Sequence, residues 1–168
     1  GFFFTPDNVK ELLIRPKESY DGAIPSGNSV AAYNFVRLGR ILSKTEYEKI
    51  SHQTITAFAN NLNKSGLGYT FMLQGLDFLN GPSYEVLVFG DPKRKGTQKI
   101  INQIMKIPQH NKVVVFAGKD GNNLEGLIPF VDMYPPSKDG EPLVYVCQNY
   151  ACNLPTDDIN QVRLQLGY

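Results

Sequence analysis

The chain has 168 residues and a mass of 18.8 kDa, which fits one domain, or one domain plus part of another, and suffices to bury a core. Lys and Arg number 17 and Asp and Glu number 16, so the net charge of +1 excludes nucleic-acid binding driven by a basic surface. Two cysteines exclude a disulfide-rich scaffold, and no apolar run is long enough to predict a membrane-spanning helix or a membrane partner.

The first residues predict neither a signal peptide nor a natural start. Gly1-Phe2-Phe3-Phe4-Thr5 lacks a basic region and a cleavage site. The chain also lacks an initiator Met, so we expect a fragment or a processed piece. The sequence gives no reason to expect secretion, so the expected location is the cytoplasm.

Residues 1–27 are expected to be mostly irregular. Three adjacent aromatic residues at Phe2–Phe4 favour a short buried strand, and Glu11–Arg15 favours a second strand that forms a hairpin with the first. Pro and Gly residues recur after this point and prevent any long regular element. Arg15–Gly27 is therefore predicted to be a polar loop.

Three helices are predicted between residues 26 and 81. The first begins at Ser26 or Asn28, both good N-caps, and runs to about Leu42, with apolar residues over most of its circumference. The second begins at Ser43 or Thr45, where the S-x-x-E spacing predicts a capping box, and its apolar stripe continues to residue 62. The third covers residues 68–80. Short links between the helices imply antiparallel neighbours.

The remainder of the chain alternates strands and helices. Apolar, β-branched runs predict strands at 84–90, 112–118 and 143–147, and amphipathic segments predict helices at 97–106 and after Asp157 or Asp158. This order favours a small parallel sheet flanked by helices. The expected class is α+β, with a helical part at residues 1–81 and an α/β part at 82–168.

The loop between the predicted strand at 84–90 and the predicted helix at 97–106 has the position of a phosphate loop but not its spacing. Gly90-Asp91-Pro92-Lys93-Arg94-Lys95-Gly96-Thr97 follows a strand and precedes a helix. Five residues separate its glycines, whereas a Walker loop needs four followed by Lys-Ser/Thr. We therefore interpret it as an ordinary surface loop, and the sequence predicts no cofactor.

Cys147 and Cys152 form a C-x4-C pair at a strand end. The spacing is wrong for a thioredoxin-type C-x-x-C motif, and a zinc site needs two further ligands. The favoured interpretation is a structural pair in which one Cys is a small core residue, while a redox pair and a metal site remain open. No metal site is predicted.

The residues from 15 to 28 are the richest candidate site. They lead into the N-terminus of a helix whose apolar residues cover most of its circumference. The N-terminus of a helix exposes unsatisfied N–H groups. Asp21 and Glu18 are the candidate acid and base groups, and the candidate ligand-binding residues are Arg15, Lys17, Tyr20, Ser26 and Asn28. The structural alternative, which the residues alone favour, makes Ser26 and Asn28 caps, Asp21 a turn residue and Arg15 a partner of Glu18.

Three stretches resemble the C-terminal region of the spermatogenesis-associated protein 20 family. They are Gly1–Thr5, the R-P-K-E-x-x-D-G-A-x-P-S-G-N run from Arg15 to Asn28, and Tyr145-Val146-Cys147-x4-Cys152-x-x-Pro155. The resemblance covers essentially the whole chain, in the same order.

The resemblance implies that this chain is the tail of a longer protein with a thioredoxin-like domain and a six-hairpin glycosidase-like α/α toroid. Residues 1–81 would be the last helical hairpins of that toroid, and 82–168 would be a small α/β subdomain with a mainly parallel sheet. Relatives of the toroid hydrolyse or epimerise sugars in a central cavity, which the loop from 15 to 28 would then face. His52 and His110 offer no counterpart to the histidines of the epimerases.

Two functions follow as hypotheses. In the first, the chain is part of a carbohydrate-processing hydrolase or isomerase-like domain that takes a carbohydrate-like small molecule. In the second, it is a non-catalytic interaction scaffold in redox or protein-handling work. In both, the expected partner is the rest of the parent chain, namely the toroid and the thioredoxin-like domain.

Overall fold

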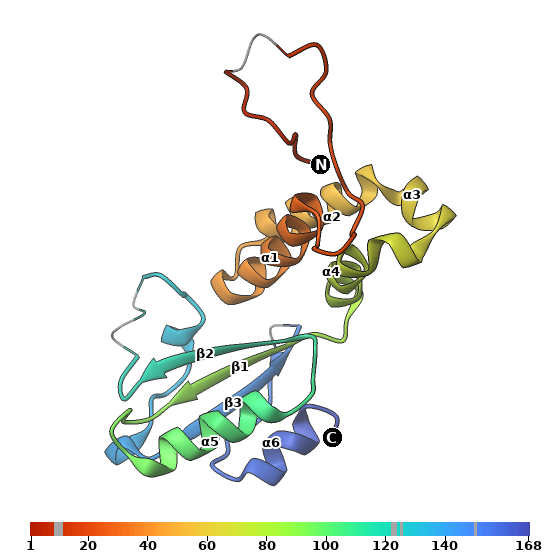
Figure 1. Ribbon diagram of the computed structural model, residues 1–168. Coiled ribbons are helices and arrows are strands. Elements are labelled where there is room, and N and C mark those ends of the chain that lie inside the picture. The colour runs from red at the N-terminus through yellow and green to blue at the C-terminus, as the bar shows by residue number, and fades with distance from the viewer. Residues whose placement is uncertain (9–11, 122–123, 125, 150) are drawn as a thin grey trace. The chain divides into compact units, whose positions relative to one another are not determined.

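The computed structural model describes residues 1–8, 12–121, 124, 126–149 and 151–168 (Figure 1). It contains two compact units, of which the first is Gly1–Gly39 with Lys44–Gly81 and the second is Arg40–Ser43 with Pro82–Tyr168. The first unit is helical, and the second carries the sheet. This combination of helices with a four-stranded sheet confirms the α+β class.

The helices of the first unit follow the sequence pattern with one break. They are α1 (Gly27–Leu42), α2 (Thr45–Ala57), α3 (Ala59–Lys64), the 3-10 turn η1 (Gly66–Tyr69) and α4 (Thr70–Asn80). The apolar stripe that continues to residue 62 predicts one helix where the structure has two, α2 and α3. The division falls at Phe58, which is buried with Ile55 and Met72 in the core of this unit. Gly81 ends α4 with a φ of 76°, which a residue with a side chain rarely adopts.

Ser43 is not the N-cap of α2, so the predicted capping box is wrong. The residue before α2 is Lys44, which makes no side-chain capping bond. Ser43 instead has a φ of 53°, in the left-handed region, and belongs with the second unit. The spacing of Ser43 and Glu46 fits a capping box, but the N-cap position of α2 lies one residue later than the motif requires, at Lys44.

The predicted N-terminal hairpin is also wrong. Phe2–Phe4 forms no strand, nor do the described residues 12–15, and Glu11 lies outside the described part of the chain. One backbone bond remains, from the Phe4 N–H to the Pro16 carbonyl at 2.9 Å. The aromatic run lacks a sheet surface to cover, and Phe4 is 71% exposed.

The sheet of the second unit has the strand order β2-β1-β3-β4. Its elements in chain order are β1 (Tyr84–Phe89), α5 (Lys95–Lys106), β2 (Lys112–Gly118), β3 (Leu143–Gln148), β4 (Ala151–Cys152) and α6 (Ile159–Gln165). β1 and β2 are parallel, whereas β3 is antiparallel to both β1 and β4. The sheet is therefore mixed and not mainly parallel as the sequence predicted.

The connections explain this mixed sheet. Parallel strands need a long crossover, and α5 supplies one between β1 and β2. In the described part of the link from β2 to β3 the helical pieces are short 3-10 turns, among them Val131–Met133 and Lys138–Gly140. β3 returns beside β1 in the opposite direction.

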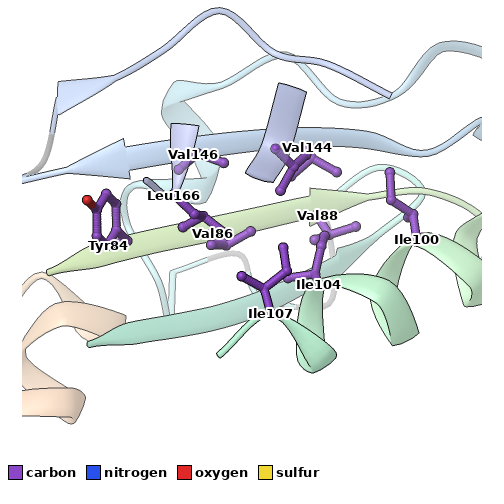
Figure 2. Packing of buried hydrophobic residues seen from close by; sticks show 10 residues of the cluster. Tyr84, Val86, Val88, Ile100, Ile104, Ile107, Val144, Val146 and Leu166 are labelled. Carbon is purple, nitrogen blue, oxygen red and sulfur yellow. The ribbon is translucent and has the colours of Figure 1, made fainter. Parts of the chain in front are cut away.

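Each face of the sheet buries a separate set of side chains. α5 and α6 cover one face (Figure 1), where Ile104 and Leu166 are fully buried against Val86 and Val146 (Figure 2). The other face packs under Phe130 and its neighbours. Because both faces are covered, every residue of β1 is buried, as its continuous apolar run predicts.

Candidate functional site

Asp21 accepts three hydrogen bonds from backbone N–H groups, one just before α1 and two in the first turn of α4. Its Oδ1 accepts from the Ser26 N–H at 2.9 Å, immediately before α1. Its Oδ2 accepts from the N–H groups of Phe71 at 2.9 Å and Met72 at 3.2 Å, in the first turn of α4. Tyr69, the residue before α4, makes no side-chain cap, so the Asp21 carboxylate performs that role from about fifty positions away. The geometry gives this carboxylate a structural role.

Ser26 and Asn28 are likewise engaged within the fold. Ser26 caps α1, because its Oγ accepts from the Ser29 N–H at 3.2 Å. Asn28 does not act as a cap. Its buried amide accepts from the Phe2 N–H at 2.6 Å and donates to the Phe2 carbonyl at 3.0 Å and the Glu18 carbonyl at 2.6 Å. Asn28 therefore fastens the N-terminal segment to α1.

The basic residues of the loop lie against an aromatic ring. The Arg15 guanidinium and the Lys17 ammonium lie 4.2 Å and 4.4 Å from the centroid of the Phe3 ring. Arg15 pairs with Asp7 at 2.5 Å, and not with Glu18 as the structural alternative expected. These contacts are cation–π interactions and a surface ion pair, which hold the segment together weakly.

A groove beside α1 collects part of the predicted site. It has a volume of about 350 Å³ and is lined by Phe2, Phe3, Phe4, Glu18, Gly27, Asn28 and Ala31. Glu18 brings its exposed carboxylate to this groove, whereas Asp21 is not among the lining residues. Tyr20 is 67% exposed and packs edge-on against Tyr69. The two candidate acid and base groups therefore have separate surroundings.

Cys147 and Cys152 form a disulfide between β3 and β4, where they are paired across the strands. Cys147 is 2% exposed, and Cys152 is partly buried. A disulfide leaves neither thiolate for a metal ion, and in the described part of the chain no group of three His, Cys, Asp or Glu residues could hold one. Nor does any helix of that part have the length and apolar character needed to cross a membrane.

Sequence reasoning missed a second cavity, which lies in the second unit. It has a volume of about 230 Å³ and is bounded by the disulfide, by Tyr134 and its neighbours, and by Ser43 and Glu85. Glu85 is 2% exposed and lies 3.6 Å from the Arg40 guanidinium. The signal that could have found it is the Glu inside the apolar run of β1, since a fully buried carboxylate is rare unless it is paired.

Burial affects the phenol of Tyr145, which packs against Tyr134 at this cavity. Tyr145 is buried, and both its burial and the neighbouring Tyr134 raise the pKa of its phenol above the usual value near 10. Its hydroxyl donates to the Pro135 carbonyl at 2.9 Å. Tyr145 thus ties β3 to the segment that covers this face of the sheet.

Comparison with known proteins finds relatives that match nearly the whole of this chain. Spermatogenesis-associated protein 20 of Rattus norvegicus is 28% identical over 165 residues, which are 97% of this chain and 21% of the relative. The Homo sapiens protein of that name is 28% identical over 153 residues, 90% of this chain and 19% of the relative. An uncharacterized protein of Caenorhabditis elegans is 26% identical over 166 residues, 96% of this chain and 22% of the relative.

No family model matches the chain, and no solved structure does. The chain spans about a fifth of the length of the curated relatives it matches. The resemblance predicted from the residues is confirmed: over 97% of its length this chain is similar to spermatogenesis-associated protein 20.

Proposed function

We propose that this chain is a non-catalytic interaction module, and that its N-terminal apolar segment docks on another part of a spermatogenesis-associated protein 20-like polypeptide. The observation that carries the proposal is the exposure of large apolar side chains before α1. We define the N-terminal apolar segment by these side chains, which are Phe2, Phe3, Phe4, Leu12, Leu13, Ile14, Tyr20 and Ile24.

The degree of exposure supports docking. Leu13 is 102% exposed, Ile24 is 79% exposed and Ile14 is 78% exposed. Single exposed apolar residues are ordinary on a protein surface, but gathered ones mark interaction sites. Burying a Leu or Ile side chain at an interface contributes about 1.5–3 kcal/mol. This segment therefore offers several such contributions to a partner.

The same geometry argues against acid–base catalysis in this loop. Glycosidases typically use a pair of carboxylates that flank the reacting bond. Asp21 is bound to three backbone N–H groups, so Glu18 is the carboxylate that remains at the groove. A single exposed carboxylate supports binding better than it supports the two-carboxylate reaction.

The length of the relatives supports the choice of partner. They are about five times as long as this chain, so most of a polypeptide of that kind lies outside the matched region. The family resemblance implies a helical toroid joined to a thioredoxin-like domain, and we propose that helices of the toroid supply the complementary surface. We propose further that the assembly acts in redox or protein-handling work.

Hydroxyl-radical footprinting tests the docking. The 168-residue chain and the native polypeptide, whose length is first measured by top-down mass spectrometry, are labelled in parallel. We expect Leu13 and Ile14 to react strongly in the isolated chain and to be protected in the native polypeptide. Leu154, which is 85% exposed in the second unit, is the control and should react equally in both. Equal labelling of Leu13 and Ile14 in the two samples would contradict the proposal.

A second candidate function is the binding of a carbohydrate-like polyol in the groove beside α1. The observation in its favour is that Phe2, Phe3 and Phe4 line the groove together with Glu18, because sugars stack on aromatic faces and donate hydrogen bonds to carboxylates. Calorimetric titration with glucose and N-acetylglucosamine tests it. Glu18→Gln and Phe4→Ala should each weaken binding, whereas Glu46→Gln, an exposed carboxylate on α2, should leave it unchanged.

A further inference from the structure

β2 is the last strand at one end of the sheet, so one of its edges faces away from the other strands. In the strand order β2-β1-β3-β4 its neighbour among the described residues is β1 (Figure 1). The Tyr84 N–H donates to the Asn111 carbonyl at 2.8 Å, which sets the direction of the backbone groups along β2. Because alternate residues of a strand bond to opposite sides, Val114 and Phe116 turn their N–H and C=O groups away from β1.

These outward backbone groups are unpaired in the described part of the chain. Neither Val114 nor Phe116 makes a hydrogen bond on that side with any described residue. Phe116 is 36% exposed and Val114 is partly exposed, whereas Val113 and Val115, whose backbone faces β1, are buried. Such an edge is a template for one more strand, because an extended chain satisfies its N–H and C=O groups. The edge therefore selects an extended polypeptide.

A groove of about 270 Å³ lies beside this edge, between β2 and α5. It is lined by Pro92, Thr97, Gln98, Ile101, Asn102 and Phe116. An apolar cavity of about 150 Å³ accommodates benzene, so the groove has room for one Leu or Phe side chain against Ile101 and Phe116. The exposed Asn102 amide has no hydrogen-bond partner among the described residues, so it is available to the backbone of an occupant.

The chain around the groove is strongly basic. Residues 90–119 contain six Lys and one Arg but a single acidic residue, although the whole chain has a net charge of +1. Lys93, Lys95 and Lys119 are exposed, and they pair with no carboxylate in the part of the chain that the structure describes. Their charges are therefore available to an acidic partner.

These lysines gather at one end of the open edge. The Gly90 N–H donates to the Gly118 carbonyl at 2.8 Å, so the loop that carries Lys93 meets the end of β2 that precedes Lys119. An acidic segment on the edge is attracted by these charges. A second copy of this chain is repelled, because antiparallel pairing of two β2 strands sets Lys119 of one copy near Lys112 of the other. Parallel pairing sets the two copies of Lys119 side by side.

We propose that the outer edge of β2 binds an extended acidic segment of a partner protein, which adds a strand beside β2 and places one large apolar side chain in the groove beside α5. The edge supplies the backbone hydrogen bonds, the groove supplies the apolar contact, and the lysines set the preference for acidic flanks. This surface lies wholly in the second unit. It does not depend on docking of the N-terminal apolar segment, so the two proposals fail or hold separately.

NMR titration of the 168-residue chain with two synthetic peptides tests this surface. The peptide EEVTFTVEE has acidic ends and a central Phe in a β-forming core, and KKVTFTVKK keeps that core with the opposite charge. We expect saturable binding of the acidic peptide with a Kd on the order of 100 μM, and binding of the basic peptide about tenfold weaker or less. The Val114 and Phe116 amides should exchange with solvent more slowly in the complex, because each donates to the added strand.

Four variants complete the experiment. Val114→Pro removes one outward N–H, at a type of edge position where proline is tolerated, and should weaken binding of the acidic peptide about tenfold. Phe116→Ala truncates the groove wall and leaves the backbone intact, so it gives the same test if Val114→Pro does not fold. Lys119→Glu should weaken binding severalfold. Lys64→Glu, at an exposed position of the first unit, is the matched control and should bind as the wild type does.

Three results would overturn the proposal. The first is the absence of saturable binding, or equal binding of the acidic and basic peptides. The second is wild-type affinity in both Val114→Pro and Phe116→Ala. The third is slow exchange of the Val114 and Phe116 amides in the native polypeptide without added peptide, because the rest of that polypeptide or a second copy then occupies the edge.

Discussion

The Asp21 carboxylate accepts a hydrogen bond from the Met72 N–H across 51 positions of sequence. A further bond, from the Ser26 N–H, joins the start of α1 to the same carboxylate. Negative charge near a helix N-terminus is favourable because it balances the N–H groups and the helix dipole. One side chain thus stabilises the starts of two helices at once.

Asp21→Asn should lower the stability of the chain. The substitution replaces one acceptor oxygen with a donor and removes the charge, so we expect a loss of about 1–3 kcal/mol in the free energy of unfolding. Urea denaturation measures it. Glu18→Gln, an exposed carboxylate of the same loop, is the matched control and should change stability little. Equal effects of the two substitutions would contradict the structural role of Asp21.

Asn28→Ala should release the N-terminal segment from α1. The amide of Asn28 is buried and bonds to Phe2 and to the Glu18 carbonyl, so its removal leaves those groups without these bonds. We expect a loss of about 2 kcal/mol and faster hydrogen exchange at the Phe2 amide. Asn34→Ala, at an exposed position of the same helix, should show neither change.

The disulfide between Cys147 and Cys152 should act mainly as a structural cross-link. It closes a short loop, for which the chain-entropy relation gives about 2 kcal/mol of stabilisation. The double substitution Cys147→Ala with Cys152→Ala should lower the stability by that amount. Because Cys147 is 2% exposed, dithiothreitol should reduce the folded chain slowly, with attack on the sulfur of Cys152. Rapid reduction without loss of stability would favour the redox interpretation.

Stability should fall above pH 10 because of Tyr145. Burial raises the pKa of its phenol in the folded chain, so the unfolded chain releases the proton first as the pH rises. The stabilisation is complete below the unfolded pKa of about 10 and is lost as the pH rises through the folded pKa. Tyr145→Phe should show a weaker pH dependence between about pH 9 and 11 in urea denaturation. Tyr168→Phe, an exposed terminal residue, should keep the dependence of the wild type.

Local interactions made several elements predictable. α1 ends at Leu42 as expected, Asp158 caps α6 by accepting from the Asn160 N–H, and the apolar run of β1 is buried throughout. A cap, a stop signal and a strand pattern each involve residues a few positions apart, so the sequence contains both sides of the interaction.

The candidate site depended on contacts that no local pattern contains. The loop from 15 to 28 was correctly recognised as polar, yet the carboxylate of Asp21 is engaged by residues about fifty positions away. The opposite holds for Ser43, where a local motif predicted a cap and the fold instead placed the residue at the wall of the cavity in the second unit. Residue type indicated chemistry, but only the packing decided which groups remain available for it.

By itself, the sequence determined most of the helices and strands after residue 26, the α+β class and the likeness to spermatogenesis-associated protein 20, because these are read from composition, periodicity and ordered motifs. Only the tertiary structure decided that β3 runs antiparallel to β1, that Phe2–Phe4 stays out of any sheet, and that Glu85 lies in a row with the disulfide. Those outcomes depend on which surfaces meet in space, and the same residues would satisfy their local preferences in more than one such arrangement.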